Sequence, residues 1–449
     1  MKPQEQKFHF VGIGGIGMCG LAELLHNMGA QVVGSDLHRN ANTERLEKLG
    51  VKIFHGHSAD QVKDADVVVY SSAVSSENPE IKYAKKNKIP LIPRAEALAE
   101  IMRLKRGIAV AGTHGKTTTT SLAASIFLEA QMEPTIVIGG RFELIKSTAL
   151  LGKGEWMIAE ADESDGSFSK LSPEIAIITN VDSDHLDFYK NFQNVQNAFY
   201  EFAKKVPFYG VCIVCGDDPL TLELFSNISK KVIFYGFNQS NDYVVSGENG
   251  KYSLQAHHQD LGNFELNVPG KHNALNATAA IIAALKVGIS FEKCQQGLHK
   301  FSGVDRRFHF KGEVAGIKIY DDYGHHPTEV RATLSAFKEK YPNNRLVVLF
   351  QPHRYSRTQS CWQDFTQCFN QADLLLLTDI YPAGEIQIEN VTSEKLSKEI
   401  KNTQCSYLAR STSLSTEIER NLKSGDVFLT LGAGDGWKHG MEILEMLKK

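Results

Sequence analysis

Residues 107–120, GIAVAGTHGKTTTT, join a short apolar run, a glycine-rich turn and a run of threonines. The apolar run predicts a buried strand, and the residues after the turn predict a helix. At such a strand-to-helix turn, backbone N–H groups and the positive end of the helix favour a chain of phosphates. We expect this stretch to begin an α/β domain that binds phosphate; the alternative is an ordinary strand-to-helix turn.

The side chains of this turn add the chemistry of a triphosphate site. Lys116 places a positive charge for the β- and γ-phosphates, and the Thr117 hydroxyl is a hard oxygen ligand of the kind that Mg²⁺ prefers. The spacing is shorter than G-x-x-x-x-G-K-[ST], because Val110 occupies the position of its first glycine. We predict ATP and Mg²⁺ as ligands. The residues expected at the phosphates are Gly112, Thr113, His114, Gly115, Lys116, Thr117 and Thr118.

A second glycine-rich loop lies nearer the N-terminus, in residues 8–20, FHFVGIGGIGMCG. Gly12, Gly14 and Gly17 fit G-x-G-x-x-G between an apolar run and an amphipathic stretch, which is the pattern of a Rossmann-like dinucleotide site. Asp36 stands about where a ribose-binding acid belongs, but it also fits a polar strand end that enters a turn. Because glycines recognise a diphosphate by backbone approach, the loop suits either NAD or another diphosphate such as a UDP-sugar.

Strand-like and helix-like runs alternate along all 449 residues, which predicts α/β architecture with parallel sheets. The pattern restarts twice, so we predict three α/β domains in series. They are a Rossmann-like N-terminal domain (1–107), a central P-loop ATPase-like domain (108–304) and a Rossmann-like C-terminal domain (305–449). Between about residues 242 and 268, short polar alternations with Asn-Gly and Gly-Asn turns predict a small antiparallel β excursion.

Composition limits the class of protein. The net charge of −3 implies no nucleic-acid partner, and the sequence has no apolar run of about 18 residues that would span a membrane. The N-terminal residues lack the apolar stretch of a signal peptide. Seven cysteines spread through a long chain suit a reducing cytoplasm. Cys212 and Cys215 form a C-x-x-C that we interpret as part of a buried strand, since no second metal-binding pair accompanies it.

Carboxylates follow two further apolar runs. Glu160 ends the run in WMIAEADESD, and His185 lies in the acid-rich loop of IITNVDSDHLDFY. The carboxyl ends of parallel strands face the ligand crevice, so Glu160 is expected to hold Mg²⁺ at the phosphates. His185 suits a second metal site there. A solvated acidic loop is the alternative for the first stretch, and a structural histidine is the alternative for His185.

Other polar clusters lie farther along the chain. Asn273 and Asn276 are spaced by one helical turn and suit an adenine edge, although Asn273 also suits a helix cap. In GVDRRF, Arg306 or Arg307 could stabilise a transferring phosphoryl group. Loops of the third domain carry basic side chains that suit carboxylate recognition. These are His325, His326, His353, Arg354 and Arg357.

Taken in order, these motifs resemble those of the Mur ligases. The resemblance rests on VGIGGIGMCGLAELL, GTHGKTTTTS, AEADESDGSF, TNVDSDHLDFY, HNALNATAA, GVDRRF, DDYGHHPTEV and QPHRYSRT, and it runs from Phe8 to the LGAGD segment. It implies three domains that bind a UDP-linked substrate, ATP and an amino acid. It also implies ATP-driven formation of an amide, and its motifs fit best the addition of L-alanine to the lactyl carboxylate of UDP-N-acetylmuramate.

The resemblance also implies roles for single residues. Lys116, Glu160, His185 and Arg307 are expected to be catalytic, with Thr117, Glu160 and His185 at metal ions. Further nucleotide contacts would come from Asn273, Asn276 and Asp322. The UDP-sugar and the amino acid would be bound by Gly12, Gly14, Gly15, Gly17, Ser71, Asn78, Arg94, His325, Arg354 and Arg357. Some related ligases use a carbamylated lysine after the metal-binding histidine, and we find no secure counterpart here.

The expected mechanism passes through an acyl phosphate that the amine of L-alanine attacks, with ADP and phosphate as the other products. Three alternatives stay open. The first is a related ligase that attaches a tripeptide, the second an NAD(P)-dependent oxidoreductase, and the third a non-catalytic nucleotide sensor. The oxidoreductase leaves GTHGKTTTT unexplained. We expect a cytoplasmic monomer or homodimer in peptidoglycan precursor synthesis.

Overall fold

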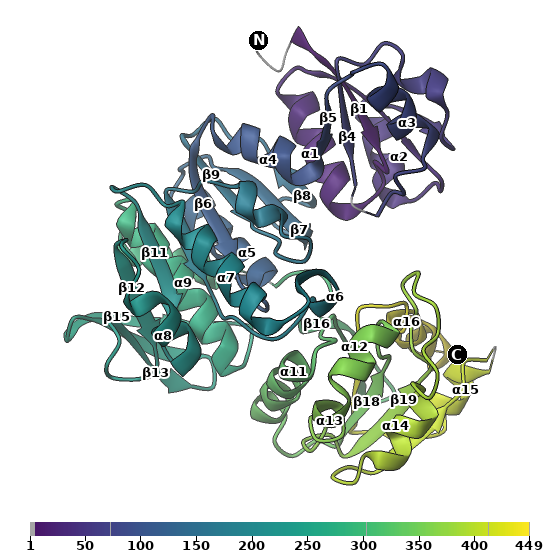
Figure 1. Ribbon diagram of the computed structural model, residues 1–449. Coiled ribbons are helices and arrows are strands. Elements are labelled where there is room, and N and C mark those ends of the chain that lie inside the picture. The colour runs from purple at the N-terminus through teal and green to yellow at the C-terminus, as the bar shows by residue number, and fades with distance from the viewer. Residues whose placement is uncertain (1–4, 72, 302, 412, 449) are drawn as a thin grey trace. The chain divides into compact units, whose positions relative to one another are not determined.

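The computed structural model describes residues 5–448 apart from 72, 302 and 412 (Figure 1). These residues form two compact units. The first contains the chain up to Val245 with Ser253–Gly262 and Leu275–Phe301. The second contains Ser246–Tyr252, Asn263–Ala274 and the chain after Phe301. Each unit is described by itself below.

The N-terminal sheet has five parallel strands in the order β3-β2-β1-β4-β5. Phe8 and Phe10 belong to the core with α1, whereas Val11 packs with Val68 and Ala84. This alternation buries both faces, as the predicted Rossmann-like domain requires. The elements are β1 (Lys7–Val11), α1 (Ile16–Asn27), β2 (Gln31–Asp36), α2 (Ala41–Lys48), β3 (Lys52–His55), η2 (Ala59–Val62), β4 (Val67–Tyr70), α3 (Pro79–Lys86), β5 (Leu91–Pro93) and α4 (Arg94–Met102).

The second sheet has ten strands in the order β15-β14-β13-β12-β11-β10-β6-β9-β7-β8. Its middle strand β6 pairs in parallel with β9 and β10, so the loops after these three strands emerge at one edge. The strands are β6 (Arg106–Ala111), β7 (Thr135–Phe142), β8 (Ser147–Leu150), β9 (Trp156–Glu160), β10 (Ile175–Ile178), β11 (Val211–Cys215), β12 (Val232–Gly236), β13 (Tyr243–Glu248), β14 (Lys251–Ala256) and β15 (Gln259–Glu265).

Helices accompany this sheet, and a close glycine contact joins two of them. The Ser125 hydroxyl in α5 donates to the Gly297 carbonyl in α10 at 2.7 Å, and a Cβ at Gly297 would lie 2.6 Å from Ile126 Cα. The helices are α5 (Lys116–Glu129), η3 (Ser167–Lys170), α6 (Leu186–Tyr189), α7 (Phe192–Lys204), α8 (Pro219–Ser226), α9 (Lys271–Lys286) and α10 (Phe291–Lys300).

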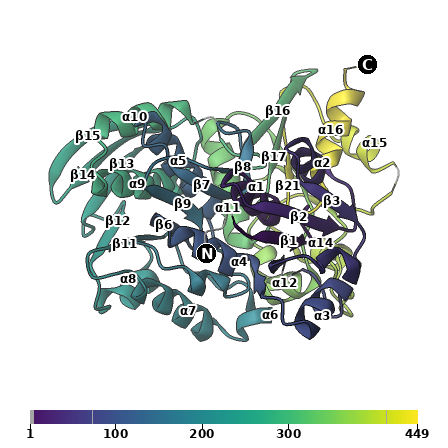
Figure 2. The ribbon, with the colours of Figure 1, turned by 90° about the horizontal axis from the view of Figure 1, so that it is seen from above.

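Antiparallel strands extend this sheet at both edges. Two-residue links join β13 to β14 and β14 to β15, and only antiparallel neighbours can be connected so tightly. This confirms the antiparallel excursion expected near residues 242–268. The antiparallel β7–β8 hairpin at the other edge was not predicted. It lies beside α1 of the N-terminal domain (Figure 2).

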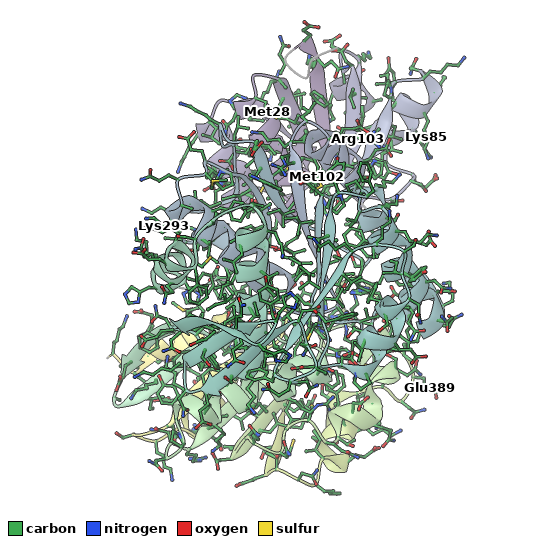
Figure 3. All side chains as sticks on the ribbon, turned by 90° about the vertical axis from the view of Figure 1, so that its left-hand side faces the viewer. Met28, Lys85, Met102, Arg103, Lys293 and Glu389 are labelled. Carbon is green, nitrogen blue, oxygen red and sulfur yellow. The ribbon has the colours of Figure 1, made fainter. Side chains whose placement is uncertain are left out.

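The junction between the first two domains is short and anchored. Met102 at the end of α4 is buried, and a Cβ at Gly107 would lie 2.7 Å from its Cγ (Figure 3). Lys105 Nζ donates to the carbonyl oxygens of Gly152 and Gly154 at 3.0 and 2.5 Å. These contacts tie the link to the central domain.

The C-terminal sheet has six strands in the order β16-β17-β21-β18-β19-β20. Only β16 is antiparallel to its neighbour. Val348 and Phe350 enter one core and Val347 and Leu349 the other, so both faces are covered. The elements are β16 (His309–Val314), β17 (Ile317–Asp322), α11 (Pro327–Lys340), β18 (Leu346–Phe350), α12 (Tyr355–Ser360), α13 (Trp362–Phe365), β19 (Leu374–Thr378), α14 (Ser393–Glu399), β20 (Cys405–Leu408), α15 (Leu414–Glu419), β21 (Val427–Leu431) and α16 (Trp437–Met446).

The three sheets confirm the predicted fold class of three α/β domains in series. Cys212 and Cys215 lie in the buried strand β11 with free thiols, as expected, and burial raises the pKa of each to about 12. Among the described residues, no helix has the length and apolar character needed to cross a membrane.

Candidate active site

The loop after β6 has a backbone that only glycine can supply at two points. Gly112 has φ of 139°, and a Cβ there would lie 1.9 Å from Thr179 Oγ1. Gly115 has φ of 85° and precedes the first turn of α5. Larger residues at these positions would be strained or would clash, so the glycines allow the loop to turn tightly into the helix.

Polar residues after β10 hold this loop in place. The His114 N–H donates to Asn180 Oδ1 at 2.9 Å, and the His114 carbonyl accepts from Thr179 Oγ1 at 2.5 Å and Asn180 Nδ2 at 3.0 Å. The Asp182 N–H donates to Thr113 Oγ1 at 2.9 Å. The sequence analysis did not select Thr179 or Asn180. Their only sequence signal is that they follow the apolar run of β10 directly.

Lys116 lies inside the loop with its charge already paired. Its ammonium donates to the Gly112 carbonyl at 2.7 Å and to Glu163 at 2.8 Å. Burial alone would lower the pKa of Lys116, but the surrounding carboxylates, Glu163 foremost, outweigh it and raise that pKa. The lysine is therefore a fixed positive charge within the loop.

Glu163 is the carboxylate that the sequence analysis left without a role. Its side chain is 1% exposed, and burial raises its pKa to about 7 although Lys116 opposes the shift. Its Oε1 lies 3.7 Å from His185 Nε2, and its backbone carbonyl accepts from the Tyr189 hydroxyl at 2.6 Å. Three acids lie in this loop, Asp162, Glu163 and Asp165, and only burial distinguishes Glu163 from the other two.

Glu160 ends β9 and accepts hydrogen bonds from two other elements, α5 and β7. Its Oε2 accepts from Thr117 Oγ1 at 3.2 Å, and its Oε1 accepts from the Gly139 N–H at 2.7 Å. A carboxylate beside a threonine hydroxyl at a phosphate loop is an oxygen donor set that suits Mg²⁺. The structure thus brings Thr117 and Glu160 together, and His185 lies beside Glu163 on the same side of the loop.

The glycine-rich loop after β1 donates backbone hydrogen bonds to a carbonyl and a carboxylate of β2. The N–H groups of Gly12 and Ile13 donate to the Ser35 carbonyl at 2.9 and 3.0 Å, and the Gly14 N–H donates to Asp36 Oδ2 at 2.8 Å. Asn42 Nδ2 donates to the Gly14 carbonyl at 2.9 Å. Asp36 therefore shapes the loop, which favours the structural interpretation of that residue.

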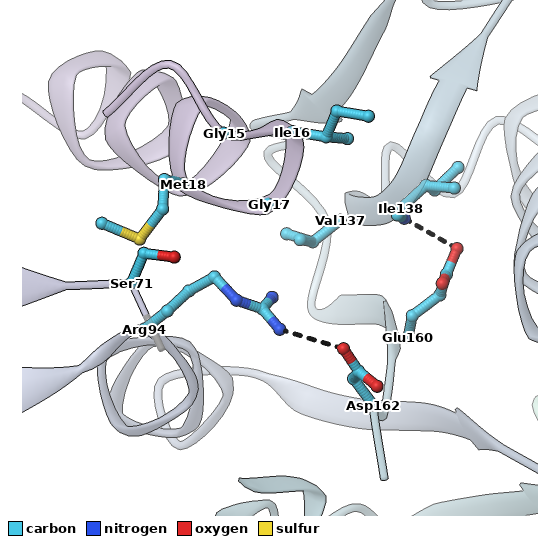
Figure 4. Close-up of a pocket in the computed structure, with 11 residues that line it drawn as sticks. Gly15, Ile16, Gly17, Met18, Ser71, Arg94, Val137, Ile138, Glu160 and Asp162 are labelled. Carbon is cyan, nitrogen blue, oxygen red and sulfur yellow. Dashed lines mark hydrogen bonds and ion pairs between the residues drawn. The ribbon is translucent and has the colours of Figure 1, made fainter. Parts of the chain in front are cut away.

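A cavity of about 270 Å³ joins this loop to the region beside the phosphate loop (Figure 4). Arg94 lies against Gly17, and its guanidinium is 3.6 Å from Asp162 across the cavity. Predicted substrate residues thus face Glu160 across one space. The lining residues are Gly15, Ile16, Gly17, Met18, Ser71, Arg94, Val137, Ile138, Gly139, Glu160 and Asp162.

Not every predicted residue lies in this cavity. The Asn78 side chain caps α3 by accepting from the N–H groups of Glu80 and Ile81, and it does not line the cavity. Asn273 and Asn276 lie on α9. Asn273 Nδ2 donates to the Pro269 carbonyl at 2.7 Å, and Asn276 Oδ1 is 2.7 Å from the position of a Cβ on Gly115. Thr118 lies in the first turn of α5.

The second unit holds its own polar cluster after β17. Arg307 and His325 both lie near Glu329, at 3.6 and 3.4 Å, and the Arg307 guanidinium lies 5.1 Å from the centre of the Tyr323 ring. Asp322 accepts from the Phe308 and Gly324 N–H groups at 2.7 and 2.8 Å. Burial raises the pKa of Asp322, and Arg307 opposes that shift.

The loop after β18 carries Arg354 and Arg357. Arg354 has φ of 71°, an uncommon conformation for a side chain of this size, and its N–H donates to the Tyr381 carbonyl at 2.9 Å. The His353 ring stacks on Tyr381 and lies 5.8 Å from the His325 ring. Burial, with help from Arg357 and Arg354, lowers the pKa of His353 to about 4. Backbone strain combined with buried basic groups is common at ligand sites.

Three family models cover most of the sequence in consecutive segments. They are described as Mur ligase family, catalytic domain (residues 7–106), Mur ligase middle domain (residues 110–284) and Mur ligase, glutamate ligase domain (residues 306–434). With this fold and this arrangement of two glycine-rich loops, the chain belongs to the Mur ligase family.

Relatives and solved structures match over the full length. The chain is 66% identical to the UDP-N-acetylmuramate–L-alanine ligase of Bdellovibrio bacteriovorus, with complete coverage of both (100%), and 50% identical to that of a Geobacter species, covering 99% of this chain and 98% of the relative. A crystal structure of UDP-N-acetylmuramate–alanine ligase from Thermotoga maritima superposes with a TM-score of 0.82 at 30% identity and 99% coverage of each chain. A murein peptide ligase from Psychrobacter arcticus shares the fold, with a TM-score of 0.74 at 24% identity and 98% coverage of each chain.

Proposed function

We propose that this chain is an ATP-dependent ligase that joins L-alanine to the lactyl carboxylate of UDP-N-acetylmuramate in peptidoglycan precursor synthesis. The observation that carries the proposal is the shared cavity. Gly15 and Gly17 of one loop face Glu160, which contacts the phosphate loop through Thr117. A substrate held by its diphosphate at the first loop would present its acid to the ATP held at the second.

The chemistry explains why both loops are needed. A carboxylate resists attack by an amine because it is anionic and its oxygen is a poor leaving group. Transfer of the γ-phosphoryl group to the carboxylate gives an acyl phosphate and ADP. The free amine of L-alanine attacks the acyl carbon, and the tetrahedral intermediate collapses to the amide and phosphate. Positioning and charge stabilisation are the tasks of the protein, and no protein nucleophile is required.

Residues of the first unit divide these tasks. Lys116 would exchange its contact with Glu163 for the ATP phosphates and stabilise the charge of the transferring group. The oxygens of Thr117 and Glu160 fit a magnesium ion, and His185 fits a second metal site close by. When bound, magnesium supplies neutralisation of phosphate charge. Arg94 would contact the UDP-sugar beside Gly17.

Residues of the second unit and of α9 enter the proposal through the family resemblance. We propose that Asn273 and Asn276 contact the adenine, Arg307 the phosphates and Asp322 the ribose. His325, Arg354 and Arg357 would bind the muramate and alanine ends. The acyl phosphate must be shielded from water, so we expect the protein to close when ATP and UDP-N-acetylmuramate bind. Small-angle scattering without compaction on addition of both ligands would contradict closure.

A phosphate-release assay with each component omitted in turn tests the function. We expect release only when ATP, Mg²⁺, UDP-N-acetylmuramate and L-alanine are all present, with UDP-N-acetylmuramoyl-L-alanine as the product by mass. Release with a tripeptide and not with L-alanine would indicate a peptide-attaching ligase. Oxidation or reduction of a nicotinamide cofactor would indicate an oxidoreductase. Nucleotide binding without turnover would indicate a sensor. Because ATP is a cytoplasmic substrate, we place the reaction in the cytoplasm.

A further inference from the structure

Three polar side chains join the N-terminal domain to the central domain at a point outside the proposed active site. Arg45 of α2 donates to Ser147 Oγ, at the start of β8, at 2.6 Å, and it also contacts Glu23 of α1. The Ser147 hydroxyl donates in turn to Glu23 Oε2 at 3.0 Å. We call Glu23, Arg45 and Ser147 the clasp. All three belong to the first unit.

The clasp is only partly exposed to water. Glu23 is 12% exposed, Arg45 28% and Ser147 7%. Charge-assisted hydrogen bonds in such surroundings are stronger and more directional than those at the surface. Removing one partner would leave partly buried polar groups of the other two without hydrogen bonds. The free energy that this costs favours the observed geometry.

A glycine contact beside the clasp brings the two domains still closer. Gly20 lies in the middle of α1, where glycine weakens a helix. A Cβ at Gly20 would lie 2.7 Å from Thr148 Oγ1 and 3.4 Å from Ala149 Cβ in β8. Close approach of α1 to β8 accounts for this glycine, since any side chain there would push the helix away.

Both ends of the clasp continue into the walls of the cavity. On one side, α1 begins directly after Gly15, and Asn42 of α2 holds the Gly14 carbonyl at 2.9 Å. On the other side, Ser147 pairs with Phe142 of β7, and the same strand provides the Gly139 N–H that holds Glu160 at 2.7 Å. The clasp therefore connects the loop expected at the UDP diphosphate to the carboxylate expected at the metal.

We propose that the clasp is a positioning element that fixes the distance between the UDP-sugar loop and the phosphoryl-transfer centre. This inference rests on the proposed function. Transfer needs the reacting atoms within about 3–3.5 Å, and a misplacement of about 1 Å can reduce the rate about 100-fold. The contacts proposed for the UDP diphosphate come from the N-terminal domain, so a loosened clasp should slow the reaction far more than it weakens UDP-sugar binding.

Arg45→Ala and Ser147→Ala test the proposal in the full-length protein. We expect each to lower kcat about 10-fold or more, with the Kd for UDP-N-acetylmuramate from calorimetry within about twofold of wild type. The double variant should be no slower than the slower single variant, since both changes open one clasp. Arg103→Ala is the matched control, because Arg103, directly after α4, is 62% exposed and forms a surface ion pair with Glu100 of that helix (Figure 3).

Gly20→Ala provides an independent variant that keeps all three clasp side chains. The added methyl would push α1 away from Thr148, so kcat should fall while the Kd for UDP-N-acetylmuramate stays within about twofold of wild type. Unchanged kcat in Arg45→Ala and Gly20→Ala, or losses that follow weaker UDP-sugar binding, would overturn the proposal. A wild-type protein that forms no amide would instead refute the proposed function, and the inference with it.

Discussion

Both glycine-rich loops turn from a strand into a helix, but they differ in where their positive charge lies. In the loop after β1, the N–H groups of Gly12 and Gly14 are held by Ser35 and Asp36, and the nearby cation, Arg94, comes from a separate helix. In the loop after β6, Lys116 is part of the loop and is paired with the buried Glu163. The first loop suits a diphosphate that is only held, and the second suits a phosphate that is transferred.

The largest effect is expected when the positive charge of the loop after β6 is removed. Lys116→Ala removes the lysine charge from the loop Gly112–Thr117, so kcat should fall about 1,000-fold or more, equivalent to about 4 kcal/mol of transition-state stabilisation. Binding of UDP-N-acetylmuramate should stay close to wild type. Lys204→Ala, which removes an exposed lysine paired with Glu201, is the control for both measurements. Retained turnover in Lys116→Ala would contradict the assignment of phosphoryl transfer to the loop after β6.

The next effect concerns the carboxylate between the loops. Glu160→Gln keeps the shape of the side chain but removes the charge expected at Mg²⁺, so kcat should fall about 100-fold and the Mg²⁺ concentration for half-maximal rate should rise. Steady-state rates across a magnesium titration measure both. Glu155→Gln, at an exposed acid, should leave the titration unchanged. An unaltered magnesium requirement in Glu160→Gln would exclude Glu160 as a ligand.

A pH series tests whether Glu163 is the buried partner of Lys116. Its pKa of about 7 lies above the ordinary value of 4.5, so ionising it in the folded protein costs free energy. Its contribution to stability is complete below pH 4.5 and is lost as pH rises to about 7. Relative to Glu163→Gln, the nucleotide-free wild type should lose about 3 kcal/mol of unfolding free energy across this window.

Denaturant unfolding at several pH values provides that comparison. Lys116 remains charged in the wild type throughout the window, because its pKa is raised above an already high value, so it contributes no slope of its own there. Parallel curves for wild type and Glu163→Gln would show that Glu163 does not titrate there.

The smallest expected effect concerns the uncharged loop. Asp36→Ala removes the acceptor of the Gly14 N–H, so the KM for UDP-N-acetylmuramate should rise about 10-fold while kcat changes little. Asp36→Asn keeps an oxygen at the same place and should stay within about threefold of wild type. Equal losses in both variants would point to a role for the charge of Asp36, as in ribose recognition.

The sequence was sufficient for the features that depend on local pattern. Alternating apolar and helical runs predicted three α/β domains, and the position of Lys116 after Gly115 predicted a tight turn into a helix, which the structure has. Glu160 was selected because it ends an apolar run, and the structure places it beside Thr117. In each case the residues that decide the feature lie within a few positions of one another.

Features that depend on distant contacts were not predictable. Asp36 fitted two roles equally until its 2.8 Å contact with the Gly14 N–H was known. Glu163 shares its loop with similar acids, and its burial depends on how α5 and α6 surround it. The β7–β8 hairpin is short and glycine-containing, and its packing partner α1 precedes it by more than a hundred residues. Tertiary packing decides all three.

The buried thiol of Cys19 gives the contact between α1 and β8 a built-in chemical reporter. Its sulfur has no exposed surface and lies 3.8 Å from Thr148 Oγ1, and burial raises its pKa. An alkylating reagent can therefore reach Cys19 only during transient separation of the helix from the hairpin. The rate at which this one peptide gains mass would record how often the two domains part, without any substitution.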